Sequence, residues 1–130
     1  MSRRLFAVPL AVLMLAAPVA AQAPVAAQAP ATVSITLSNF HIAPTPIHLA
    51  AGQPVRLVFT NASGGGHDFT APAFFANAHG LAGPVERGQV ELAGHASASV
   101  TLVPARGTYK AKCTHFAHKM MGMSATIIVD

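Results

Sequence analysis

The chain has 130 residues, of which only 9% are charged, and a formal net charge of +4. Two of its arginines belong to an N-terminal leader, and without them six basic residues face four acidic ones. A net charge of +2, with no basic patch and no interleaved aromatic residues, does not favour nucleic-acid binding. The length allows one domain with one hydrophobic core.

Residues 1–21 have the layout of a secretory signal peptide. Arg3 and Arg4 precede an apolar run over residues 5–17, and small residues follow that run. The apolar run is too short to predict a membrane span. We therefore expect cleavage after Ala21, a periplasmic or secreted protein, and no membrane insertion once the leader has been removed.

A linker is predicted over residues 22–31. The hexapeptide Val-Ala-Ala-Gln-Ala-Pro occurs twice in succession, over residues 19–24 and 25–30. This composition offers nothing specific to bury, and the repeated proline interrupts a helix. The folded domain is expected to occupy residues 32–130.

That domain is predicted to consist of strands. Apolar residues alternate with polar ones in short segments separated by turns that contain proline and glycine. The segments are residues 33–38, 47–49, 55–59, 90–92, 100–102, 108–113 and 124–129. No segment predicts an amphipathic helix, and residues 71–88 are expected to form a long loop or a short helix. The pattern favours an all-β protein, an antiparallel sandwich or barrel.

The only cysteine of the chain lies near its C-terminus and is a candidate metal ligand. Cys113 is followed five residues later by His118, and His118 five residues later by Met123. A lone cysteine in an exported protein cannot form an internal disulfide, whereas a metal-bound thiolate is protected from oxidation. Thiolate, imidazole and thioether together suit copper. A second imidazole is expected from His67, which follows three glycines.

This arrangement resembles the cupredoxins, small blue-copper proteins such as plastocyanin, azurin, pseudoazurin and rusticyanin, whose last ligand loop often reads Cys-x4-His-x4-Met. The resemblance covers residues 33–130. It implies a one-domain Greek-key antiparallel β-sandwich that binds one copper ion, cycling between Cu(I) and Cu(II). The expected ligands are His67, Cys113 and His118, with Met123 as a weak axial ligand.

The resemblance also implies groups that support these ligands. In the family the loop histidine is commonly followed by Asn, where this chain has Asp68 after His67. The backbone N–H of Asp68 is expected to donate to the Cys113 sulfur, and Thr114 to tie the two loops together. A buried Asp68 carboxylate requires hydrogen bonds, and its charge is expected to favour Cu(II) and lower the reduction potential.

Two alternative ligands stay open on the last loop. Many relatives have a Pro-Gly pair before the C-terminal histidine, where residues 116–117 are Phe-Ala. If the loop folds differently, His115 competes with His118, and Met121 competes with Met123. The spacings favour His118 and Met123.

We expect a one-electron carrier rather than an enzyme. The chain has no His-x-His pair and no histidine next to its cysteine, which excludes the multicopper oxidase pattern, and its single cysteine excludes a binuclear site. The expected partners are redox proteins such as c-type cytochromes, docking on an apolar patch around His118, and we expect a monomer. The alternative is a copper chaperone or buffer that delivers the ion to a receiving protein, or an accessory copper-binding module.

Overall fold

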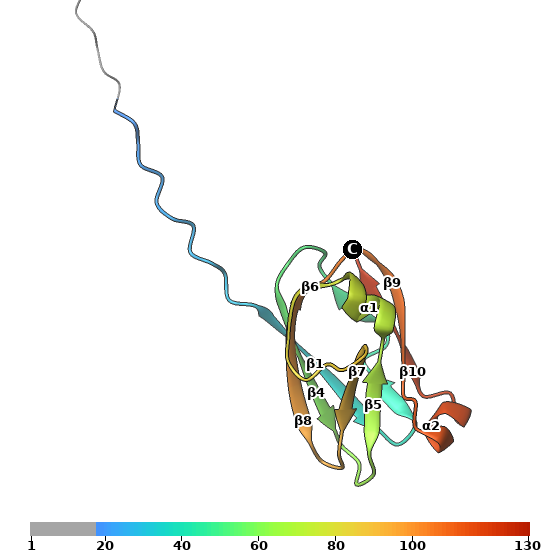
Figure 1. The fold of residues 1–130 in the computed structure, drawn as a ribbon. Coiled ribbons are helices and arrows are strands. Elements are labelled where there is room, and N and C mark those ends of the chain that lie inside the picture. The colour runs from blue at the N-terminus through green and yellow to red at the C-terminus, as the bar shows by residue number, and fades with distance from the viewer. Residues whose placement is uncertain (1–17) are drawn as a thin grey trace, which may run out of the picture.

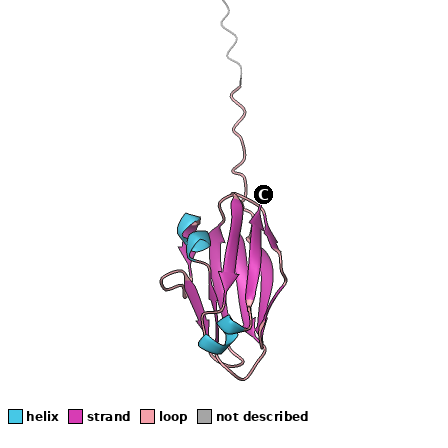
Figure 2. Ribbon diagram, turned by 90° about the vertical axis from the view of Figure 1, so that its right-hand side faces the viewer, coloured by secondary structure: helices cyan, strands magenta, loops and turns pink. Residues whose placement is uncertain are grey.

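The computed structural model describes residues 18–130, so most of the predicted signal peptide lies outside the described part. Residues 18–30 have no regular secondary structure, are exposed and lead away from a β-sandwich (Figures 1 and 2). The boundaries of the leader and of the linker therefore stay predictions. Within residues 18–130, neither helix has the length and apolar character that crossing a membrane would require.

The first sheet has five strands in the order β2-β1-β4-β8-β6. Their bounds are β1 Ala31–Ser38, β2 His41–Ala43, β4 Val55–Asn61, β6 His79–Ala82 and β8 Ser97–Val103. The β1–β4 pair is parallel and the others are antiparallel. Along β4, Val55, Leu57, Phe59 and Asn61 are buried, which is the two-residue period of a strand with one face on the core.

The second sheet also has five strands, in the order β3-β10-β9-β5-β7. Their bounds are β3 Ile47–Leu49, β5 His67–Thr70, β7 Gln89–Leu92, β9 Gly107–Lys112 and β10 Ser124–Val129. Here the β3–β10 pair is parallel and the remaining pairs are antiparallel. The predicted all-β sandwich is confirmed.

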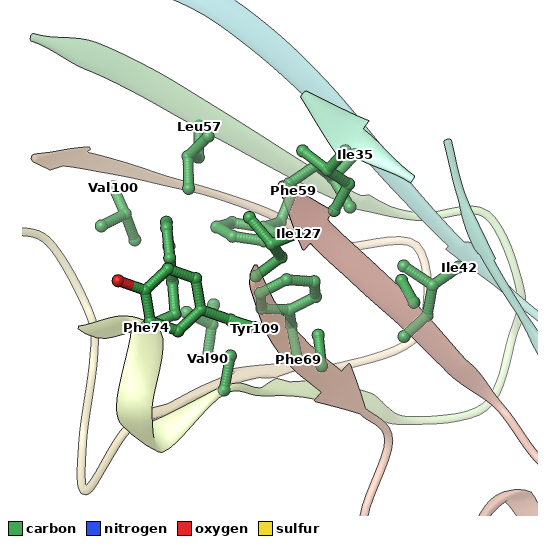
Figure 3. Packing of buried hydrophobic residues seen from close by; sticks show 14 of the residues in the cluster. Ile35, Ile42, Leu57, Phe59, Phe69, Phe74, Val90, Val100, Tyr109 and Ile127 are labelled. Carbon is green, nitrogen blue, oxygen red and sulfur yellow. The ribbon is translucent and has the colours of Figure 1, made fainter. Parts of the chain in front are cut away.

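The inward faces of the two sheets form one hydrophobic core (Figure 3). Aromatic rings make up its centre: the Phe59 and Phe69 rings lie 4.9 Å apart, and those of Phe74 and Tyr109 lie 5.5 Å apart. Full burial of one such side chain stabilises the fold by about 1.5–3 kcal/mol. Ring packing therefore joins β4 of one sheet to β5 of the other, and joins β9 to the helix-forming segment that carries Phe74. Strands β5 and β9 lead to the candidate ligands.

Two short helices lie at opposite ends of the sandwich (Figures 1 and 2). Helix α1, Pro72–Asn77, lies in the segment expected to form a loop or short helix and buries two phenylalanines. Helix α2, Phe116–Met120, lies in the loop between β9 and β10, at the end away from the C-terminus. It is followed by Gly122 at φ +71°, a left-handed conformation that suits glycine at the end of a helix.

Helix α2 and three strands were not predicted. No helix was expected over residues 116–120, and this expectation was wrong. Five residues are too few to show a 3.6-residue period. Strand β2 has only three residues, β5 is buried at all four positions, and β6 is exposed at all four. None of the three therefore alternates clearly.

Candidate metal centre

Three predicted ligands from different parts of the chain meet at the α2 end of the sandwich. His67 begins β5, Cys113 directly follows β9, and His118 lies in α2. Because β5 and β9 are neighbours in one sheet, the first two are brought together by strand pairing. One nitrogen of each histidine and the cysteine sulfur all lie within 4.8 Å of one another.

The donor atoms face a common point. The Cys113 sulfur lies 3.5 Å from Nδ1 of His118, and the rings of His67 and His118 stack with centroids 4.2 Å apart. The Nδ1 atom of His67 is buried and has no hydrogen-bond partner among the described residues. Buried nitrogens rarely stay unpartnered. A metal ion held by these donors would supply the partner that this nitrogen lacks, so the donor set fits the implied copper.

The two methionines of the last loop are in different environments. Met123, directly before β10, is 1% exposed, and its carbonyl accepts a hydrogen bond of 3.1 Å from the Cys113 N–H. Met121 is 62% exposed. A thioether in solvent is poorly placed to join a ligand set that is built around a buried thiol, so burial favours Met123 over Met121.

The competing histidine is engaged elsewhere. Nε2 of His115 lies 2.8 Å from a carboxylate oxygen of Glu91 and 3.7 Å from one of Asp68. Its ring lies parallel to that of His118, but their centroids are 5.6 Å apart. His118, whose Nδ1 reaches the sulfur, is therefore the better placed of the two.

Asp68 joins the two ligand loops, as the resemblance implied. Its backbone N–H lies 3.5 Å from the Cys113 sulfur, in donor geometry. Its fully buried carboxylate accepts hydrogen bonds from the Thr114 N–H at 3.0 Å and the Thr114 hydroxyl at 2.7 Å. The Thr70 hydroxyl adds a further bond of 2.7 Å. These donors satisfy the buried carboxylate, which would otherwise be strongly destabilising.

Burial sets the protonation of two candidate ligands in the metal-free protein. Desolvation, followed by the neighbouring His118 and His115, lowers the pKa of His67 from its usual 6.5. Desolvation likewise raises the pKa of the Cys113 thiol above 9.0, although N–H donors from Asp68 and His115 oppose it. His67 is therefore neutral and ready to bind a metal, whereas Cys113 must lose a proton when a metal binds.

Two residues next to the candidate ligands were not predicted. The Ser63 hydroxyl lies 2.7 Å from Nε2 of His67, and the Phe40 ring packs edge-on against His118 with centroids 5.5 Å apart. Ser63 precedes three glycines and has the composition of an ordinary turn. Phe40 comes from the turn between β1 and β2, and no sequence pattern connects it to the last loop.

Known proteins place this chain in a family. A model described as a cupredoxin-like domain matches residues 8–129. A solved structure of auracyanin B is 28% identical, covering 79% of this chain and 91% of its own, with a TM-score of 0.60. Auracyanin from Roseiflexus castenholzii is 22% identical, covering 79% of this chain and 99% of its own, with a TM-score of 0.60. Auracyanin A from Chloroflexus aurantiacus, described as a "blue" copper protein, is 23% identical, covering 78% of this chain and 100% of its own, with a TM-score of 0.55.

No curated protein matches the sequence significantly. The family match and the clustered donors confirm copper as the expected cofactor. The family model covers nearly the whole chain, and the fold agrees with it. The chain therefore belongs to the cupredoxin-like family.

Proposed function

We propose that this protein binds one copper ion through His67, Cys113, His118 and Met123 and carries single electrons between redox partners outside the cytoplasm. The observation that carries the proposal is the convergence of the buried His67 imidazole and the partly exposed His118 imidazole on the buried Cys113 thiol, with an unpartnered nitrogen on His67. A copper ion held by these donors would accept and donate one electron by cycling between Cu(I) and Cu(II).

The surroundings of the donors favour electron transfer over catalysis. His67 and Cys113 are fixed by strand ends, and the Cys113 sulfur is held by the Asp68 N–H. Donors held this firmly move little when the charge of the metal changes, so electron transfer needs little rearrangement. With Met123 as the fourth ligand, no position is left for a substrate, which supports a carrier rather than an enzyme.

Exposed apolar side chains on and directly after helix α2 offer a docking surface for a redox partner. Phe116 is 82% exposed and Met120 is 74% exposed, and both belong to the same helix as the partly exposed His118. Met121, directly after this helix, is 62% exposed and extends the same surface. Exposed apolar residues that cluster often mark an interaction site. A weak, short-lived complex with a protein such as a c-type cytochrome suits this small patch. Export through the predicted signal peptide would place the protein in the periplasm or outside the cell.

A copper titration tests the proposal. Adding Cu(II) to the purified protein is expected to produce an intense visible thiolate-to-copper band and a narrow copper hyperfine splitting. Voltammetry of the copper-loaded protein is then expected to show a reversible one-electron couple. Cys113→Ser is expected to abolish the band, and His48→Ala, which alters an exposed histidine on β3, is expected to leave it unchanged. A blue product from Cys113→Ser would refute the ligand assignment.

Copper handling is the second candidate function. The exposed thioethers of Met120 and Met121 lie in the loop that carries His118 and are suited to Cu(I). A chaperone, buffer or accessory module would hold Cu(I) in a colourless form and pass it to a receiving protein without reversible redox cycling. Voltammetry of the copper-loaded protein distinguishes the two functions.

A further inference from the structure

One ring nitrogen of the candidate ligand His67 has a hydrogen-bonded support, whereas the other has no hydrogen-bond partner among the described residues. Its Nε2 lies 2.7 Å from the Ser63 hydroxyl, and that hydroxyl lies 2.8 Å from Oδ1 of Asn61. All three side chains are buried. Since a hydroxyl has only one proton, the direction of these two bonds can be worked out from their surroundings.

Asn61 fixes the direction. Its Nδ2 lies 2.7 Å from the carbonyl oxygen of Gly65, 3.0 Å from that of Ala93 and 3.3 Å from that of Leu92. Carbonyls only accept, so this atom must be the amide NH₂ group. The Ser63 backbone N–H points at the other atom, at 3.0 Å, and confirms it as the oxygen.

The Ser63 proton must therefore go to an acceptor other than the imidazole. Oδ1 of Asn61 at 2.8 Å, and the Gly65 carbonyl at 3.3 Å, are both acceptors. If the hydroxyl donated to His67 instead, its oxygen would face Oδ1 of Asn61 at 2.8 Å with no proton between them. The hydroxyl consequently accepts from the imidazole, and the imidazole proton resides on Nε2.

The backbone holds Ser63 in place. The His95 N–H donates to the Ser63 carbonyl at 2.9 Å, and the Asn61 N–H donates to the Ala96 carbonyl at 2.9 Å. Residue 94 is glycine where the two loops cross, and a Cβ there would overlap the backbone of Gly64. The hydroxyl is thus positioned by the fold and needs no metal to orient it.

We propose that Ser63 is a positioning residue that holds the His67 imidazole with its proton on Nε2, leaving the Nδ1 lone pair free for the metal before any metal arrives. This inference rests on the proposed function only in taking His67 as a ligand. Support of this kind behind a ligand typically changes metal affinity by about 10–100-fold.

Two measurements test the proposal: the His67 tautomer in the metal-free protein and the affinity of the protein for Cu(II). Nitrogen NMR of the metal-free protein is expected to show His67 protonated on Nε2 alone. In Ser63→Ala both tautomers are expected, together with a loss of Cu(II) affinity of about 10–100-fold in competition with a chelator. Ser63→Thr, which keeps the hydroxyl, is expected to restore both the Nε2 tautomer of His67 and the Cu(II) affinity. Ser97→Ala is the control, because the Ser97 hydroxyl bonds Thr60 on the surface.

Distinct outcomes overturn distinct statements. A His67 proton on Nδ1 in the unaltered metal-free protein overturns the inference, even if Ser63→Ala does not fold. An unchanged tautomer and an unchanged affinity in Ser63→Ala overturn it as well. A protein with the expected tautomer that forms no blue copper centre instead refutes the proposed function and leaves the positioning role of Ser63 intact.

Discussion

Replacing Asp68 by Asn changes one buried charge beside the proposed copper ligands and little else. The carboxylate oxygen that accepts from Thr114 can be replaced by the amide oxygen, and the amide NH₂ can donate to the Thr70 hydroxyl. The backbone N–H that reaches the Cys113 sulfur is present in both residues. The substitution therefore isolates the effect of the negative charge on the redox couple.

The size of the effect follows from the distance between the charge and the sulfur. A carboxylate oxygen of Asp68 lies 3.9 Å from the Cys113 sulfur, and the carboxylate is completely buried. Two unit charges about 4 Å apart interact by about 1 kcal/mol in water and by about 4 kcal/mol at the dielectric typical near protein surfaces. At about 2.3 kcal/mol per 100 mV, removing the charge should raise the reduction potential by about 40–170 mV. The sign is positive because the anion stabilises Cu(II) over Cu(I).

Voltammetry of the copper-loaded variant gives the potential, and its visible band reports whether the ligand geometry is retained. Glu91→Gln is the matched control, since it removes the same charge from a side chain that is 56% exposed and therefore screened by solvent. Its shift should be smaller than that of Asp68→Asn. An unchanged or lower potential in Asp68→Asn, or equal shifts in both variants, would refute the reasoning.

Three further predictions concern docking, pH and the core. Met121→Glu should slow electron exchange with a c-type cytochrome in stopped-flow mixing without changing the visible spectrum, and an unchanged rate would place the docking surface elsewhere. The metal-free protein should lose stability below pH 6.5, where unfolding lets His67 take up a proton, and above pH 9.0, where unfolding lets Cys113 release one. Urea unfolding below pH 6.5, above pH 9.0 and between them measures the free energy of unfolding. A free energy that does not change with pH contradicts the prediction. Phe59→Ala should reduce the free energy of unfolding by about 3–5 kcal/mol, whereas Phe116→Ala, at an exposed site, should change it by less than about 0.5 kcal/mol; similar losses would refute the core assignment.

The sequence predicts those strands that bury one face. Val55, Leu57 and Phe59 are buried and alternate with neighbours that are less buried, because β4 packs one side on the core. Strand β5 could not be found in this way, since all four of its residues are buried. Its burial comes from contacts with distant segments, such as Phe69 with Phe59, and no local pattern records them.

The candidate ligands on the last loop could be proposed from spacing, because Cys113, His118 and Met123 lie on one hairpin between neighbouring strands. His67 could be proposed only from the need of such a site for a second imidazole, because it comes from another strand and its spacing to Cys113 carries no signal. Ser63 could not be predicted at all. Its role depends on the Asn61 side chain and on carbonyls about thirty residues further along the chain, and serine before glycines is ordinary turn composition.

Strand β1 connects the N-terminal segment to the proposed copper end. Its first residue, Ala31, follows the extended segment, and the turn after its last residue carries Phe40, whose ring contacts His118. At about 3.3 Å per residue, eight residues separate these points by about 26 Å. A protein held at a surface by its leading segment would thus present the proposed copper-binding end outward, where an incoming partner meets neither the attachment nor the surface.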